Sequence, residues 1–241
     1  MSFMYNPFPF DDPKPINRPK LSEKTIKSVV TGGTPNVAKK FIADIAEKVK
    51  SEGVIVGIDG YTTANWKQFV DLLARECIIN GFDFEVVDSN KETLKSGKEI
   101  DDMIDPNLIW DTKIDPTLLY GKLYHGGYIG LFDEAKMEQF KKDIPAKKTA
   151  GKLVVVAGYG SLIPEFRDMY DVKCWFDLTP MKTILRIRNG EYANIGKERP
   201  GIINRTIRRC YYCDFECAVQ LRKDLWKNNV PDYFFLDNDH G

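Results

Sequence analysis

A glycine turn between an apolar run and an amphipathic segment is the part of this sequence best suited to chemistry. Residues 54–58 are apolar and mostly β-branched, as in a short buried parallel strand. The turn that follows reads Gly60, Tyr61, Thr62, Thr63, Ala64, Asn65, Trp66 and Lys67, and apolar residues then recur at helical spacing as far as Cys77. The N–H groups of such a turn and of the helix start form an anion site. We therefore predict phosphate or nucleotide binding at residues 60–67.

The turn departs from the usual phosphate-binding loop in its side chains. That motif reads G-x-x-x-x-G-K-[ST]. Counted from Gly60, Asn65 stands at the second glycine, Trp66 at the lysine and Lys67 at the serine or threonine. Lys67 does not replace the missing lysine, because a residue one place further along a helix points about 100° away. The turn has the shape of the motif without its charged groups.

Composition limits the class of protein. The 241 residues suit one domain with an appendage, and a hydrophobic share of 43% allows a sizeable core. A net charge of +0 argues against nucleic-acid binding. No apolar run approaches the length of a membrane span, and the N-terminus does not resemble a signal peptide. Five cysteines do not indicate a disulfide framework, so we expect a cytoplasmic protein.

The order of the segments predicts the fold. Residues 1–20 contain several prolines and aromatics and are expected to form an extended arm, which either packs on the domain or reaches a second subunit or domain. In residues 21–241 the expected strands (54–58, 84–88, 153–158, 172–178 and 233–237) alternate with helices. This alternation predicts an α/β three-layer sandwich with a mostly parallel sheet of about five strands. The turns after Gly57, Asp88 and Ala157 should lie close together at the carboxyl edge of the sheet.

Residues 105–127 interrupt this rhythm with glycines and prolines. We expect a weak strand at 108–110, then an irregular insertion, and a short strand or turn at 129–133. Long irregular loops in compact domains are often functional. Tyr120, Tyr124 and His125 are therefore candidates to line a substrate pocket, although a single histidine is more often structural.

Two clusters downstream have alternative readings. Cys210, Cys213 and Cys217 are spaced like metal ligands, but the same spacing on a helix forms an apolar stripe. We predict core packing and no metal site. The basic residues between 197 and 209 form either a lid over a phosphate or the solvated start of a helix, and the sequence leaves both readings open.

The order of these features resembles the uridine kinase-like branch of the P-loop kinases. The resemblance rests on the glycine turn, the strand ending in Asp88, the segment Phe166–Asp177 and the triplet Arg186-Ile187-Arg188. The chain is also similar to the kinase-like N-terminal segment of some bacterial class I mannose-6-phosphate isomerases, through residues 10–13 and 120–124.

The kinase resemblance implies roles for particular residues. Asp88 matches an acid near the accepting hydroxyl group, Asp59 is a second candidate acid, and Arg186 and Arg188 match lid arginines that neutralise the transferring phosphate. ATP and Mg²⁺ are the implied cofactors. The absent lysine at Trp66 and the absent strand-end glutamate at Ala157 imply weak or no transfer, with a phosphorylated small molecule or nucleotide as ligand. An active nucleoside or sugar kinase, and a regulatory domain linked to an isomerase, are the alternatives.

Overall fold

The computed structural model describes residues 23, 33–117 and 120–237. The predicted arm at residues 1–20 therefore lies outside the described residues. Within the described residues, no helix combines the length and the apolar character that a membrane span requires.

The centre of the molecule is a parallel sheet with the strand order β2-β3-β1-β4-β5. The strands are β1 (Val54–Gly60), β2 (Asp83–Asp88), β3 (Lys152–Ala157), β4 (Val172–Asp177) and β5 (Tyr233–Leu236). All four pairings are parallel. Since β1 lies in the middle and is buried along its whole length, the turn after it lies at the centre of the carboxyl edge. The predicted α/β class and the five-stranded sheet are confirmed.

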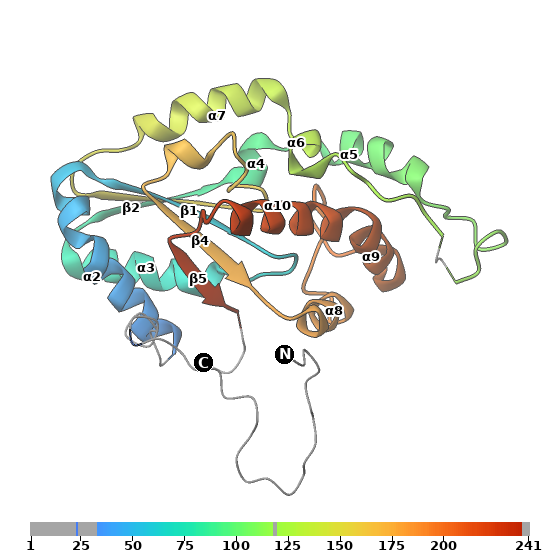
Figure 1. The fold of residues 1–241 in the computed structure, drawn as a ribbon, viewed down its shortest axis with the longest axis horizontal. Coiled ribbons are helices and arrows are strands. Elements are labelled where there is room, and N and C mark those ends of the chain that lie inside the picture. The colour runs from blue at the N-terminus through green and yellow to red at the C-terminus, as the bar shows by residue number, and fades with distance from the viewer. Residues whose placement is uncertain (1–22, 24–32, 118–119, 238–241) are drawn as a thin grey trace, which may run out of the picture.

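Helices cover both faces of the sheet, as Figure 1 shows. One apolar cluster joins Val54, Val56 and Ile58 to α2 (Thr34–Glu52) and α3 (Lys67–Asn80). The cluster on the opposite face contains Ile55 and Trp175 and includes buried residues of α7 (Glu134–Ala146) and α10 (Phe215–Lys227). Side chains of a strand point alternately to the two faces, so β1 contributes to both clusters. This arrangement is the predicted three-layer sandwich.

The remaining helices are short and stand between the strands. They are α4 (Ser89–Thr93), α5 (Gly97–Ile104), α6 (Gly127–Leu131), α8 (Pro180–Arg188) and α9 (Ile203–Arg209), with 3₁₀ turns at Asp105–Asn107 and Arg167–Met169. A π-helical turn, Cys210–Asp214, joins α9 to α10. Thr179 caps α8 by accepting a hydrogen bond from the Lys182 N–H group, and Pro180 is the first residue of the helix.

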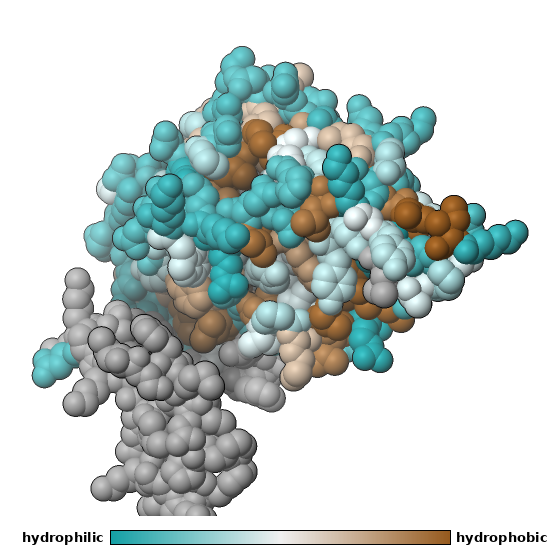
Figure 2. Space-filling view, turned by 45° about the vertical axis from the view of Figure 1, so that its right-hand side comes forward, coloured by the Kyte–Doolittle hydropathy of each residue, from teal (hydrophilic) through white to brown (hydrophobic). Residues whose placement is uncertain are grey.

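Two local predictions in the insertion were wrong. The segment expected as a strand or turn at 129–133 instead supplies the last residues of α6 (Gly127–Leu131), which ends at the extended Phe132. Leu108 forms only an isolated bridge with Gly121 instead of a strand. The insertion projects beyond α5, and Figure 2 shows hydrophobic surface near this projecting end. Its exposed apolar side chains are Ile109, Ile114, Tyr120 and Leu123.

The predicted apolar cysteine stripe is confirmed. Cys210, Cys213 and Cys217 are buried and free of disulfides. No group of three side chains suited to holding a metal ion occurs in the part of the chain that the structure describes.

Candidate functional site

The glycine turn lies at the carboxyl end of β1, where the sheet brings several loops together. The Tyr159 hydroxyl donates to the Ala64 carbonyl at 3.3 Å, and the Asn90 side chain bonds both backbone groups of Tyr159. The turns after β1, β2 and β3 are thus in contact, as the topology predicted.

The first part of the turn is held by the protein itself. The Gly60 N–H group donates to Asp59 at 2.7 Å, and the Tyr61 N–H group donates to the Phe176 carbonyl at 2.9 Å. The Ala64 N–H group donates within the turn to the Tyr61 carbonyl at 2.8 Å. These N–H groups are therefore already used inside the fold.

A carboxylate from the last strand binds the second part of the turn. Asp237 directly follows β5, and its Oδ2 atom accepts the Asn65 N–H group at 2.7 Å. The Arg186 guanidinium binds both oxygens of the same carboxylate, at 2.5 and 3.0 Å. The Lys182 ammonium donates to the Asp237 backbone carbonyl at 2.6 Å. Asn65 occupies the position of the second motif glycine, so Asp237 sits on one of the N–H groups expected to bind phosphate.

Two further side chains occupy the turn. The Asn65 Oδ1 atom accepts the N–H group of Lys67, the first residue of α3, at 3.1 Å. The Tyr159 hydroxyl donates to the Ala64 carbonyl at 3.3 Å, and its ring packs edge-on against Trp66 at 5.1 Å between centroids. Trp66 thus packs beside the turn where the motif would place a lysine, and Lys67 is exposed.

Asp59 lies behind the turn and has no exposed surface. Its carboxylate accepts the N–H groups of Gly60 at 2.7 Å and Leu162 at 3.0 Å. Burial raises the pKa of Asp59 to about 7, although these N–H groups oppose the shift. In this arrangement Asp59 connects β1 to the loop after β3 and does not face the surface.

Asp88 is exposed at the end of β2. Its Oδ1 atom caps α4 by accepting the N–H groups of Asn90 at 3.0 Å and Lys91 at 3.2 Å. A groove of about 780 Å³ lies beside it, between the outer edge of β2 and α7. Of the two candidate acids, Asp88 is therefore the one that a ligand can reach.

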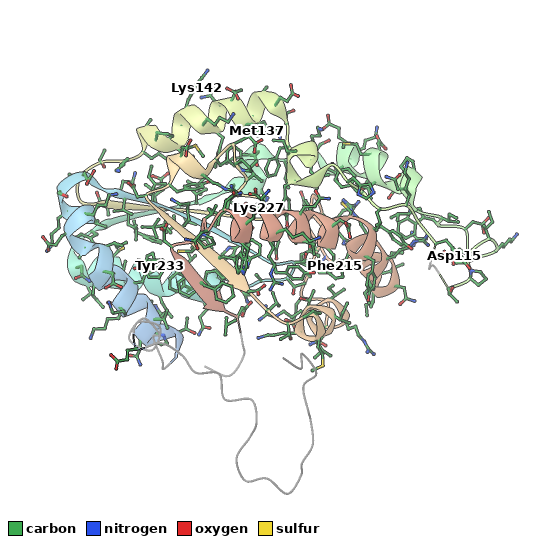
Figure 3. The ribbon with its side chains drawn as sticks, viewed as in Figure 1. Asp115, Met137, Lys142, Phe215, Lys227 and Tyr233 are labelled. Atoms are coloured by element: carbon green, nitrogen blue, oxygen red, sulfur yellow. The ribbon has the colours of Figure 1, made fainter. Side chains whose placement is uncertain are left out.

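Three cations of α9 and of the loop before it are paired with aspartates of α5 and the insertion. Arg208 binds Asp115 at 3.3 Å, Arg209 binds Asp101 at 2.6 Å, and Lys197 also binds Asp101. Figure 3 shows Asp115 in the projecting insertion. Arg186 is directed to Asp237, whereas Arg188 is exposed at the end of α8. The basic residues between 197 and 209 thus join α9 and the loop before it to α5 and the insertion.

The three insertion residues singled out from the sequence do not share one pocket. Tyr120 is 65% exposed, and His125 is exposed. Tyr124 is half-buried. Its hydroxyl packs against Gly126 and Gly130, where an added Cβ atom would lie 2.3 Å and 2.2 Å from it. A pocket of about 420 Å³ does lie beside the insertion, but it is lined by Thr117, Leu123 and residues of α9 and the π turn instead.

Sequence reasoning missed Asp237, Lys182 and Tyr159. The sequence could have pointed to Asp237, because this residue ends a predicted strand at the same edge of the sheet as Asp88. Tyr159 follows β3 and carried the same positional signal. Lys182 lies one turn before Arg186 on the same helix.

The donor set does not fit a magnesium nucleotide as the motif would bind it. Lys67 stands where a hydroxyl would bind the metal, and Ala157 replaces the strand-end acid. The Asn65 N–H group and the Arg186 guanidinium nevertheless remain groups that bind an anion.

Comparisons with known proteins agree with this fold. The family model described as a domain of unknown function, DUF8485, matches residues 40–240, so the chain belongs to that family. No curated protein matches the sequence. A solved structure assigned as a fructose transport system kinase, from Silicibacter sp. TM1040, is similar over 85% of this chain and all of its own length, with 13% identity and a TM-score of 0.52. At that identity the likeness shows the fold alone.

Two further solved structures are similar at lower TM-scores. A protein assigned as a uridine kinase from Bacillus stearothermophilus covers 83% of this chain and 98% of its own, with 11% identity and a TM-score of 0.48. Phosphoribulokinase from Rhodobacter spheroides covers 70% and 67%, with 11% identity and a TM-score of 0.41. The fold itself, an α/β architecture with a five-stranded parallel sheet, is shown by the strand order and by the likeness to the fructose transport system kinase.

Proposed function

We propose that this member of the DUF8485 family is a degenerate P-loop kinase-like domain that binds a nucleotide or phosphosugar with weak or no phosphotransfer. The observation that carries the proposal is the bond from the Asn65 N–H group to Asp237, whose carboxylate also pairs with Arg186. An internal carboxylate stands where a phosphate group would bind. The division into an arm at 1–20 and one domain at 21–241, and a cytoplasmic location, remain parts of this proposal.

The absence of efficient transfer follows from charge. Phosphoryl transfer relies on positioning and on cations that stabilise the charge of the transition state. Trp66 replaces the motif lysine, and Arg186 is neutralised by Asp237. Losing one such stabilising group costs a factor of roughly 10² to 10³ in rate. The combined losses favour a binding role over a catalytic one.

One observation favours a second candidate, an active ATP-dependent kinase of a nucleoside or sugar. Asp88 is exposed at the carboxyl edge beside a groove of about 780 Å³, where a hydroxyl-bearing substrate can approach it. In that case Asp88 acts as the base or orienting group, Arg188 supplies an exposed cation, and ATP with Mg²⁺ is required.

Thermal unfolding with added ligands tests the proposal. The chain is heated alone and with millimolar Mg-ATP, Mg-GTP, phosphate or mannose 6-phosphate. A ligand that binds only the folded state adds about 2.7 kcal/mol at a hundred times its dissociation constant. A raised midpoint with a nucleotide or the phosphosugar supports the proposal, and a shift with mannose 6-phosphate alone supports a sensor for a linked isomerase. No shift with any of them contradicts ligand binding.

Trp66→Lys separates the two candidates. An active kinase that works with substitute groups should keep or gain transfer when the motif lysine is restored. A module adapted to another ligand should lose that ligand, because the ring of Trp66 packs against Tyr159 beside the turn.

A further inference from the structure

We propose that Asp237 is a built-in substitute for a phosphate group: a phosphate monoester or inorganic phosphate binds the turn by displacing its carboxylate. The end of β5 and the ligand are then mutually exclusive occupants of one site. This inference rests on the proposed function, because it names the ligand class and the regulation of the same turn.

The geometry around Asp237 is that of an anion site. Arg186 binds the two carboxylate oxygens through two different nitrogens, at 2.5 and 3.0 Å. The Asn65 N–H group adds a third bond at 2.7 Å. A guanidinium fork combined with a backbone N–H group at a helix start recognises carboxylate and phosphate alike.

The site stays assembled when the carboxylate leaves. Arg186 also donates to the Thr63 carbonyl at 2.8 Å, so the turn itself holds the guanidinium in place. The Arg186 and Asp237 side chains are only 10% and 11% exposed, which strengthens their attraction for charge. The Thr63 hydroxyl, on the same turn, is buried and has no hydrogen-bond partner among the residues that the structure describes.

Charge favours phosphate over another carboxylate. Lys182 lies 3.9 Å from the Asp237 carboxylate and shares it with Arg186. A phosphate dianion brings three terminal oxygens and a second negative charge to these two cations. The ligand class is therefore a phosphate group rather than a single carboxylate.

Displacement of the Asp237 carboxylate concerns the end of β5 alone. Asp237 follows the last residue of β5, and its backbone N–H group donates to the Asp177 carbonyl at 2.8 Å. Because Leu236 is 66% exposed, withdrawal of Asp237 does not pull the side chain that precedes it out of the core. The carboxylate can leave while the sheet stays intact.

The test compares Asp237→Asn with Asp232→Asn. Asp232 precedes the same strand and accepts the Lys173 N–H group at 2.8 Å, so it is a matched control. Inorganic phosphate is titrated calorimetrically into each protein at constant ionic strength, with chloride as the reference anion. We expect D237N to bind phosphate at least about tenfold more tightly than the wild type and D232N. Adding Arg186→Gln to D237N should remove that gain.

Two results would overturn the inference. One is a folded D237N protein that binds phosphate no better than D232N, and the other is a gain that persists without Arg186. If D237N does not fold, amide NMR of the wild type in tens of millimolar phosphate decides. Displacement requires the Asn65 signal to move relative to chloride, and an unchanged signal rejects it.

The outcome is separable from that of the proposed function. Efficient phosphotransfer by the wild type would contradict the proposed function whatever D237N binds. Failure of D237N to bind phosphate, without phosphotransfer by the wild type, would remove only the inference about Asp237.

Discussion

Removing the Asp115 carboxylate should leave the buried guanidinium of Arg208 without its anion. The two side chains are 0% and 1% exposed, with 3.3 Å between the Arg208 Nη1 and Asp115 Oδ2 atoms. Asp115 also accepts the Tyr120 N–H group at 2.7 Å. The Arg208 guanidinium lies 5.2 Å from the ring centroid of Trp110. This pair therefore joins the insertion to α9.

The expected magnitude follows from burial. Breaking a buried ion pair by removing one partner typically costs about 3–5 kcal/mol, because the remaining charge is desolvated and unpaired. A domain of ordinary stability has about 5–15 kcal/mol in total. Asp115→Asn keeps the volume of the side chain and removes its charge, so we expect a loss near 3 kcal/mol, measured by urea unfolding at pH 7.

Asp111→Asn is the control from the same segment. Asp111 is exposed, and its side chain accepts a local bond from the Lys113 N–H group at 2.8 Å. We expect that variant to lose about 1 kcal/mol or less. Replacing both members of the buried pair, as in Asp115→Leu with Arg208→Met, should restore part of the lost stability. A loss below about 1 kcal/mol in D115N would refute the argument that this pair stabilises the fold.

Three further predictions concern Asp59, Gly60 and the cysteines. Burial raises the pKa of Asp59 from 3.8 to about 7, so the folded state holds a proton that the unfolded chain releases. Stability should fall as pH rises from about 4 to 7, by at most about 1.4 kcal/mol per pH unit, and Asp59→Asn should remove this slope in urea unfolding; an unchanged slope contradicts the assignment. Gly60→Ala should cost about 1–3 kcal/mol in the same assay, because its Cβ atom would lie 2.6 Å from Ala64; a neutral variant would refute that close approach. All five cysteines are buried, and burial raises the pKa of Cys77 to about 12, so mass spectrometry should find none alkylated by iodoacetamide until urea is added. Labelling of the native protein would contradict their burial.

The sequence was informative where local pattern determines structure. The alternation of β-branched runs with amphipathic segments predicted the sheet and both helical layers, since periodicity follows from which face is buried. It also placed the cysteine stripe correctly. The pattern was ambiguous at 129–133, where a short apolar run with glycines fits either a strand or a helical turn, and α6 formed.

The candidate site could be predicted only in part, because its closing contact is remote in sequence. Asn65 and Asp237 are 172 positions apart, and no local spacing reports that they meet. The orientation of Asp59 was hidden for a different reason. Every residue of β1 is buried, so the strand shows no polar alternation that would tell which side chain faces a ligand. Asp88, at the end of a half-exposed strand, was easier to place.

Transfer of the γ-phosphate from Mg-ATP is the measurement that tests the central claim most directly. The purified chain is incubated with labelled ATP and panels of nucleosides and sugars, and labelled products are counted against Asp88→Asn and a no-protein control. We expect at most weak transfer, with product close to that of the D88N variant, because Trp66 replaces the motif lysine and Arg186 is neutralised by Asp237. Efficient transfer to a defined acceptor, on the order of one turnover per second or faster and abolished in D88N, would contradict this expectation and would identify an active kinase.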